Sequence, residues 1–447
     1  MKNKLIVFFS LLFAISGYSQ ETPIAFSLQE AIDFALENNR NVKNAARDID
    51  MAKEEKWQAT ATGLPQINGA VDYQNWLKQQ VSLLPAELVG GNPGEFVPVE
   101  FSPKQNINAK ATLSQLIFDG SYLVALKASK VYLEISENAK IKTDLEVRKA
   151  VINAYGNVLL TEESIKILES NKAILESNLE EIQKTFENGL EEEESVEQIK
   201  ITLSSLMSDY NNVKRLKLLA YQMLNITLGI DLNTPTVLTD NLEILSLQYT
   251  SLEALAADDS VENNIDYLIA ENEVESKDLL VKLAMSKGMP TLSAFVNGGY
   301  SAFGEDFGFF NSNQKWYASS MFGVSLNIPI FSSLGRSSAT QEARIDLEKA
   351  NESFVEIEQK IKLDIARAKS EYQFAIEDYA NKKQNLDLAE RIERKNETKF
   401  FEGISSSFDL RQAQTQLYVA QQEYLQSMID IINKKAELDA ILSQINY

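Results

Sequence analysis

The acidic side chains of this sequence are clustered in a way that could attract ions. Gly189 is followed, one residue later, by four consecutive acidic residues, Glu191, Glu192, Glu193 and Glu194. Asp409 follows Gly403 in a related segment. Clustered carboxylates attract cations. The glutamates therefore predict either a cation-attracting ring, if several copies of the chain meet there, or a solvated turn with four charges.

Other chemistry is restricted by composition. The chain contains no histidine and no cysteine, which excludes disulfides, zinc–thiolate sites and a lipid-modified cysteine. Nucleophile–base pairs would have to come from Ser, Asp, Glu and Lys, and none recurs at a spacing typical of a catalytic site. We predict no enzymatic activity, no cofactor and no metal site. The net charge of −21 repels phosphate backbones and argues against nucleic acid as a partner.

Both acidic segments belong to a repeated pattern in which a glycine interrupts helical periodicity. Segments 186–210 and 400–424 share five identical residues, including both glycines. A glycine after the last turn supplies the left-handed conformation that ends a helix. Each segment is therefore predicted to be the tip of a helical hairpin. The tip residues are Gly189 and Leu190 in the first copy, and Gly403, Ile404 and Ser405 in the second.

The N-terminus has the features of a secretory signal peptide. In residues 1–19, two lysines precede an apolar core, and Gly17 and Ser19 are small residues at the cleavage positions. The apolar core is too short for a membrane anchor, which needs about 20 residues. We therefore expect residues 20–447 to be exported.

Periodicity along the exported chain changes from helical to alternating. A helix at 28–37 follows a capping-box pattern that begins at Ser27, and a second helix is expected at 41–62. Alternation of apolar and polar residues then predicts two-faced strands, which are expected at about 66–78, 106–118, 291–300 and 317–330. Four prolines between the first two strands exclude regular structure there.

Long helices follow each pair of strands. The first is expected at 121–186, and a second helix at 195–228 runs back along it after the glycine tip. The long helix of the second half ends at the other glycine tip and is followed by a helix at 408–441. The exported chain is thus predicted to be a single domain of two structural repeats, at about 27–230 and 251–443.

Four residues mark the junctions between strands and long helices. These are Phe118, Gly120, Pro329 and Phe331. We expect them to be structural, with the phenylalanines and the proline packing the junctions rather than binding a ligand.

Four strands impose a physical requirement on the assembly. Their expected lengths suit a bilayer, where a tilted strand needs about 9 to 11 residues. Four strands cannot close a barrel, and each unpaired backbone group in hydrocarbon costs several kcal/mol. The sheet can therefore span a membrane only by pairing with other copies of itself. About twelve strands would leave a lumen, with polar strand faces inside and apolar faces against lipid.

The sequence resembles the TolC-like outer membrane efflux factors over essentially the whole exported chain. The order and spacing of seven motifs carry this resemblance, namely SLQEAIDFALENN at 27–39, GLPQ at 63–66, LSQLIFDG at 113–120, FENGL at 186–190, GMPTL at 288–292, VSLNIPIF at 324–331 and FFEGISSSFDL at 400–410.

The resemblance implies an α+β membrane protein of the Gram-negative outer membrane. The family forms a homotrimer in which a twelve-stranded β-barrel, four strands per chain, is continued by a long periplasmic α-helical barrel. This duct accepts substrate from an inner-membrane pump through a periplasmic adaptor, in a tripartite efflux or type I secretion system. The pattern does not separate drugs, metal ions and polypeptides as substrates. An exported structural or adhesive coiled coil is the alternative.

The resemblance also implies roles for the tips. They form the periplasmic mouth, where the adaptor docks, and the matching residues are the five tip residues named above. Asp409 matches the first of two constriction aspartates, and Gln412 replaces the second. Ser405 stands where the family often has arginine, and Ser195 where it has an acidic residue.

Overall fold

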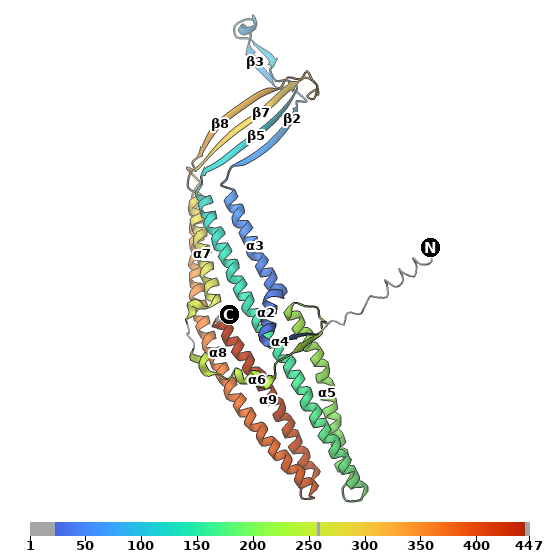
Figure 1. Ribbon diagram of the computed structural model, residues 1–447. Coiled ribbons are helices and arrows are strands. Elements are labelled where there is room, and N and C mark those ends of the chain that lie inside the picture. The colour runs from blue at the N-terminus through green and yellow to red at the C-terminus, as the bar shows by residue number, and fades with distance from the viewer. Residues whose placement is uncertain (1–22, 257–259, 443–447) are drawn as a thin grey trace, which may run out of the picture. The chain divides into compact units, whose positions relative to one another are not determined.

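The computed structural model describes residues 23–256 and 260–442, which form two compact units (Figure 1). The helical unit contains the described parts of residues 1–49, 136–270 and 354–447. The sheet unit contains Asp50–Ile135 and Glu271–Ser353. The expected signal peptide lies outside the described residues.

Two very long helices run through the chain, together with several shorter ones. The longest, α4 (Gly120–Glu187) and α8 (Gly335–Phe401), have 68 and 67 residues, and each begins in the sheet unit. The other α-helices of the described residues are α2 (Leu28–Asn38), α3 (Arg40–Ala61), α5 (Glu193–Leu228), α6 (Leu242–Gln248), α7 (Ile265–Ser286) and α9 (Ser407–Ile441). Most of α3 and most of α7 belong to the sheet unit. Two short 3-10 helices, η2 (Leu252–Ala256) and η3 (Val261–Asn263), precede α7. Within the described ranges, no helix combines the length and the apolar character needed to cross a membrane.

The sheet unit is built on four antiparallel strands in the order β2-β5-β7-β8 (Figure 1). Their bounds are β2 (Gln66–Asn75), β5 (Gln105–Phe118), β7 (Thr291–Gly304) and β8 (Tyr317–Asn327). β8 stops before Pro329, which cannot donate a ladder hydrogen bond. Among the residues that the structure describes, β2 and β8 are the outer strands, and each has an edge without a neighbouring strand.

One face of the sheet is mostly apolar, and the other is mostly polar but also carries Phe295, Phe303 and Met321. Residues directly opposite each other across strands share a face, as Tyr73, Ile107 and Ala302 do. The apolar face continues through Val71, Ala109, Leu113, Val296, Phe322 and Val324, and the polar face through Gln66, Asn68, Asn106, Asn108, Thr112 and Ser319. Phe309, from the loop after β7, is buried on the apolar face against Ile107 and Ala302.

The segment between β2 and β5 corrects one expectation. Despite its prolines it forms β3 (Val81–Pro85), a 3-10 turn η1 (Ala86–Val89) and β4 (Phe96–Glu100). β3 and β4 form a separate antiparallel ribbon in which Pro98 lies opposite Leu83. Both strands of a two-stranded ribbon are edges, so a proline is tolerated when its missing N–H would point away from the partner strand.

A matching asparagine contact precedes α3 in the first half and α7 in the second half. Nδ2 of Asn39 donates to the carbonyl of Thr227 near the end of α5 at 2.7 Å, and Nδ2 of Asn264 donates to the carbonyl of Ile441 at the end of α9 at 2.6 Å. Each Oδ1 accepts the N–H two residues further on, at 2.8 Å. Both asparagines therefore begin a helix, α3 or α7, and attach it to the returning helix of the same half.

Tyr155 of α4 is a buried centre of the helical unit. Its hydroxyl lies 2.8 Å from Oδ2 of Asp240 and 3.0 Å from the carbonyl oxygen of Phe26, and these two acceptors share its single proton. Phe26 ends β1 (Ile24–Phe26), which pairs in parallel with β6 (Thr236–Leu238). Burial, and next the bond to Asp240, raises the pKa of Tyr155, so the phenol remains a neutral donor.

Replacing Tyr155 with phenylalanine is expected to destabilise the helical unit by about 1–3 kcal/mol, because Asp240 and the carbonyl of Phe26 would lose a buried donor. Thermal denaturation of the purified protein measures this loss. Tyr210→Phe is the control, because the Tyr210 hydroxyl donates to Glu169 at 2.7 Å in an exposed position. Equal shifts in both variants would contradict the central role of Tyr155.

Candidate functional site

The first helical tip ends as its sequence predicts. Gly189 has a φ of 73°. Its N–H donates to the carbonyl of Phe186 at 2.8 Å, and the N–H of Leu190 donates to the carbonyl of Thr185 at 3.1 Å. These bonds satisfy the last carbonyls of α4 in the pattern typical of a glycine C-cap. The side chain of Leu190 is 78% exposed at the turn.

The second tip has the same geometry. Gly403 has a φ of 72°. Its N–H donates to the carbonyl of Phe400 at 2.9 Å, and the N–H of Ile404 donates to the carbonyl of Lys399 at 2.8 Å. Ile404 is exposed like Leu190. Within the helical unit both turns lie at the same end (Figure 1).

The four glutamates begin helix α5 and differ in environment. Glu191 is partly buried, and its Oε1 accepts a hydrogen bond of 2.6 Å from the hydroxyl of Ser195. Glu192 is the N-cap residue, while Glu193 and Glu194 lie exposed in the first turn. Carboxylates near a helix N-terminus interact favourably with its dipole. The glutamates therefore favour the start of α5 at this position.

Asp409 forms a capping box at the start of α9. Its Oδ2 accepts hydrogen bonds from the Ser406 hydroxyl at 2.8 Å, the Ser406 N–H at 3.2 Å and the Ser405 hydroxyl at 3.1 Å. The bonds from the Ser406 side chain and backbone, followed by that from Ser405, lower the pKa of Asp409. The stabilising effect of the ionised cap is present above the ordinary pKa of about 4 and is lost as pH falls through the lowered value.

A small apolar cluster joins the two tips. It consists of Ile182, Val196, Ile199, Phe400 and Leu410, all buried. The hydroxyl of Ser407 also lies 3.3 Å from Oε1 of Gln198. The two hairpins of one chain therefore meet beside their tips through residues from α4, α5, α8 and α9.

A groove of about 880 Å³ lies between α5 and α9 above the tips. Gln412 lines it, whereas Asp409 and the four glutamates do not. Its charged lining residues, Asp209 and Arg411, were not singled out from the sequence. The Arg411 guanidinium lies 5.4 Å from the centroid of the Phe408 ring. Phe408 and Arg411 are three residues apart, which places them on one face of a helix. This spacing was the one feature of the sequence that could have indicated their contact.

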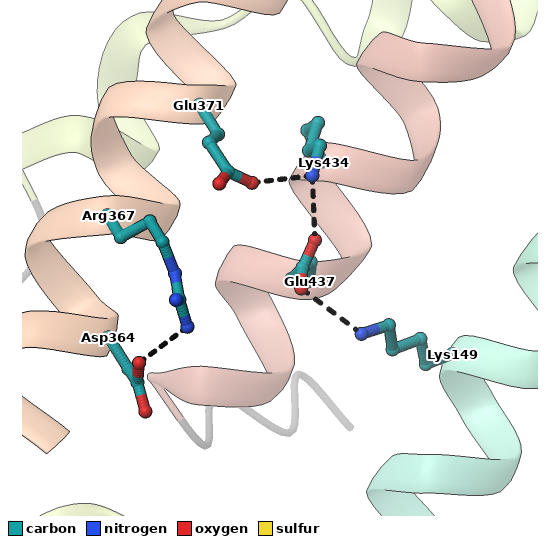
Figure 2. A network of polar contacts seen from close by, with 6 residues as sticks. All are labelled: Lys149, Asp364, Arg367, Glu371, Lys434 and Glu437. Carbon is teal, nitrogen blue, oxygen red and sulfur yellow. Dashed lines mark hydrogen bonds and ion pairs between the residues drawn. The ribbon is translucent and has the colours of Figure 1, made fainter. Parts of the chain in front are cut away.

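Further from the tips, an ion-pair network connects three helices (Figure 2). Nζ of Lys434 on α9 lies 2.5 Å from Glu371 on α8 and 3.2 Å from Glu437. Lys149 on α4 lies 3.4 Å from Glu437. Burial acts to raise the pKa of Glu437, but the bond from Lys434 and the charges of both lysines lower it. The two pairs that join different helices, Lys434–Glu371 and Lys149–Glu437, have no spacing in the sequence that could have revealed them.

A buried carboxylate on α8 was also missed. Glu393 is only 8% exposed. Burial, with the nearby charge of Glu397, raises the pKa of Glu393. Glu397 in turn accepts a hydrogen bond of 3.1 Å from Nδ2 of Asn178 on α4.

The junction residues differ from one another. A Cβ on Gly120 would lie 2.7 Å from Sδ of Met289, so this glycine permits a close approach between α4 and the residues after α7. The carbonyl of Pro329 accepts a hydrogen bond of 3.0 Å from Arg336. Phe118 and Phe331 are 42% and 82% exposed. The packing expected of the two phenylalanines is therefore not formed within a single chain.

Known proteins resemble this chain in both sequence and fold. The family model described as outer membrane efflux protein matches residues 31–229 and 256–444. The outer membrane protein TolC of Vibrio cholerae serotype O1 is 24% identical over 367 residues, which cover 79% of this chain and 77% of the relative.

Two solved structures show the likeness in fold. The CusC structure has a TM-score of 0.75 at 18% identity and covers 95% of both chains. The VceC structure from Vibrio cholerae has a TM-score of 0.71 at 16% identity, and the match covers 93% of this chain and 96% of VceC.

Proposed function

Because the chain belongs to the outer membrane efflux protein family, we propose that three copies form the exit duct of a tripartite efflux or type I secretion system. Members of the family are channel proteins of the Gram-negative outer membrane with a periplasmic helical part, and this chain is one of them. In the proposed duct, substrates delivered by an inner-membrane pump and a periplasmic adaptor pass through without further chemistry.

The four-stranded sheet is the observation that carries this proposal. One face is mostly apolar and the other mostly polar, and within the described part of the chain the outer strands β2 and β8 each have an edge without a partner strand. In a bilayer such edges must be paired. Pairing β8 of one copy with β2 of the next closes the sheet, and three copies supply the twelve strands of a barrel with a lumen.

The exposed junction phenylalanines support the same assembly. Phe331 and its neighbours Ile330 and Leu334 are 82%, 88% and 75% exposed in one chain. Large apolar side chains exposed next to an unpaired sheet edge mark an interaction surface. We assign this surface to the neighbouring copy, where the phenylalanines would complete their packing.

The two tips are the proposed docking point for the adaptor. Their turns expose Leu190 and Ile404, and both lie at one end of the helical unit (Figure 1). A threefold assembly would present six such turns around one opening. The acidic residues beside these turns would then surround the periplasmic mouth.

Extraction from the outer membrane and reconstitution test the function. We expect a heat-modifiable trimer in the outer-membrane fraction that produces ion conductance in planar bilayers. A monomer in the soluble periplasmic fraction, without conductance, would instead support an exported structural coiled coil.

Removing the charge of Asp409 is expected to lower the cation preference of this conductance by about two-fold or more, because three carboxylates would leave the mouth. The test is the reversal potential of Asp409→Asn channels in a salt gradient. Ser406→Ala is the matched control, because it weakens the capping box but keeps the charge. Unchanged selectivity in Asp409→Asn, or an equal change in Ser406→Ala, would contradict the constriction role.

A further inference from the structure

The four strands of the main sheet contain two charged residues, and both lie on the polar face. Asp72 is on β2 and Lys110 on β5, while the other residues of these strands and all of β7 and β8 are uncharged. Asp72 lies opposite Asn108 and Lys110 opposite Ala70, so the charges are diagonal neighbours. Nζ of Lys110 lies 4.0 Å from Oδ2 of Asp72.

Small residues flank Lys110 on this face. Ala70 lies beside it on β2 and Gly299 on β7. A Cβ on Gly299 would lie 3.0 Å from the Cβ of Lys110 and 2.5 Å from the carbonyl oxygen of Ala109. The lysine therefore projects above its neighbours. The side chains of Lys110 and Asp72 remain 57% and 55% exposed.

The rest of this face offers mainly amides and hydroxyls, together with the apolar side chains of Phe295, Phe303 and Met321. Its members include Asn68, Gln74, Asn106, Thr112, Asn297, Ser319 and Ser325. In the proposed duct this face lines the lumen, so Asp72 and Lys110 would be the fixed charges that the strands contribute to the lumen wall. Each chain contributes one negative charge, from Asp72, and one positive charge, from Lys110.

We propose that the three Asp72–Lys110 pairs form a belt that sets the electrostatic potential of the outer-membrane section, and that the two signs cancel. This inference rests on the proposed function. Solutes of either charge would cross the section equally well, so any charge selection would have to take place at the acidic periplasmic mouth.

A single cysteine in the full-length protein can report the potential beside the belt. The natural chain has no cysteine. Ser319 on β8 lies opposite Gly299, which lies opposite Lys110, so it is two strand spacings, about 10 Å, from the lysine. The measurement compares the rates at which Ser319→Cys reacts with positively and negatively charged methanethiosulfonate reagents in outer-membrane vesicles.

Removing one sign of charge is expected to shift this rate ratio. Lys110→Gln should raise the cationic-to-anionic ratio by about four-fold, since one charge at this distance in water changes each rate about two-fold in opposite directions. Asp72→Asn should lower the ratio, and the double variant should restore it. Unchanged ratios in the single variants, or a double variant that keeps a shifted ratio, would overturn the proposal.

A second cysteine variant, at the residue next to Ser319, shows whether a negative result contradicts the belt alone or the proposed duct as well. Ala318 lies opposite Tyr300 on the apolar face. In the proposed duct Ala318→Cys faces lipid and reacts far more slowly than Ser319→Cys. If both cysteines react at the same rate, the sheet is not embedded in a membrane and the proposed function fails. If the two cysteines react at different rates but replacing Asp72 or Lys110 leaves the cationic-to-anionic rate ratio unchanged, the proposed belt is wrong and the proposed duct still stands.

Discussion

Arginine in place of Phe322 is expected to abolish assembly in the outer membrane, while arginine in place of the adjacent Met321 is tolerated. Both side chains are exposed in the single chain, at 69% and 54%. Phe322 lies opposite Val296 on the apolar face, and Met321 lies opposite Asn297 on the polar face. An arginine that faces lipid at the membrane midplane costs about 2–4 kcal/mol in each copy, and a trimer contains three.

The measurement is the amount of heat-modifiable trimer that each variant forms in the outer-membrane fraction. Phe322→Leu is the matched control, because it keeps an apolar side chain at the same position. If Met321→Arg fails as completely as Phe322→Arg, the strand tolerates no arginine on either face. If both variants assemble normally, the apolar face does not contact lipid.

Tryptophan in place of Gly189 or Gly403 is expected to reduce export to background while the trimer still forms. Both glycines have a positive φ, and no atom lies within 4 Å of an added Cβ. A bulky residue would strain the turn by about 1–2 kcal/mol, which is small beside the interactions of a long hairpin. It would also occupy the space where we propose that the adaptor docks.

The β3–β4 ribbon provides a control at another glycine that has a positive φ. Gly94 has a φ of 86° and open space around its Cβ position, but lies between η1 and β4. Gly94→Trp should therefore leave export intact, as measured by substrate accumulation in cells that produce equal amounts of trimer. Loss of the trimer in Gly189→Trp or Gly403→Trp would show that these glycines act as helix caps alone.

Local patterns were sufficient to predict the main elements of the fold. The two glycine tips begin and end within a residue or two of their expected positions, because a C-cap glycine has a local conformational cause. The resemblance to TolC-like outer membrane efflux factors is confirmed by the family match. The alternating pattern also indicated which residues share a face of the sheet, since side chains alternate along a strand.

Interactions between distant segments were not predictable in this way. The Tyr155–Asp240 bond and the Lys434–Glu371 ion pair join residues whose separation in sequence follows no period. The β3–β4 ribbon was missed because its prolines were interpreted without considering that each strand of a ribbon is an edge. The capping box of Ser406 and Asp409 was not predicted either, although a serine three residues before an acidic residue is its usual pattern.

The unpaired edges of the sheet have a genetic consequence. In the proposed trimer, each copy closes the barrel for its neighbours, so a cell that makes two versions of the chain builds mixed trimers. With equal amounts of each, roughly one trimer in eight contains only the normal chain. A variant that assembles but has a blocked tip should therefore be dominant, whereas Phe322→Arg, which is excluded from assembly, should be recessive.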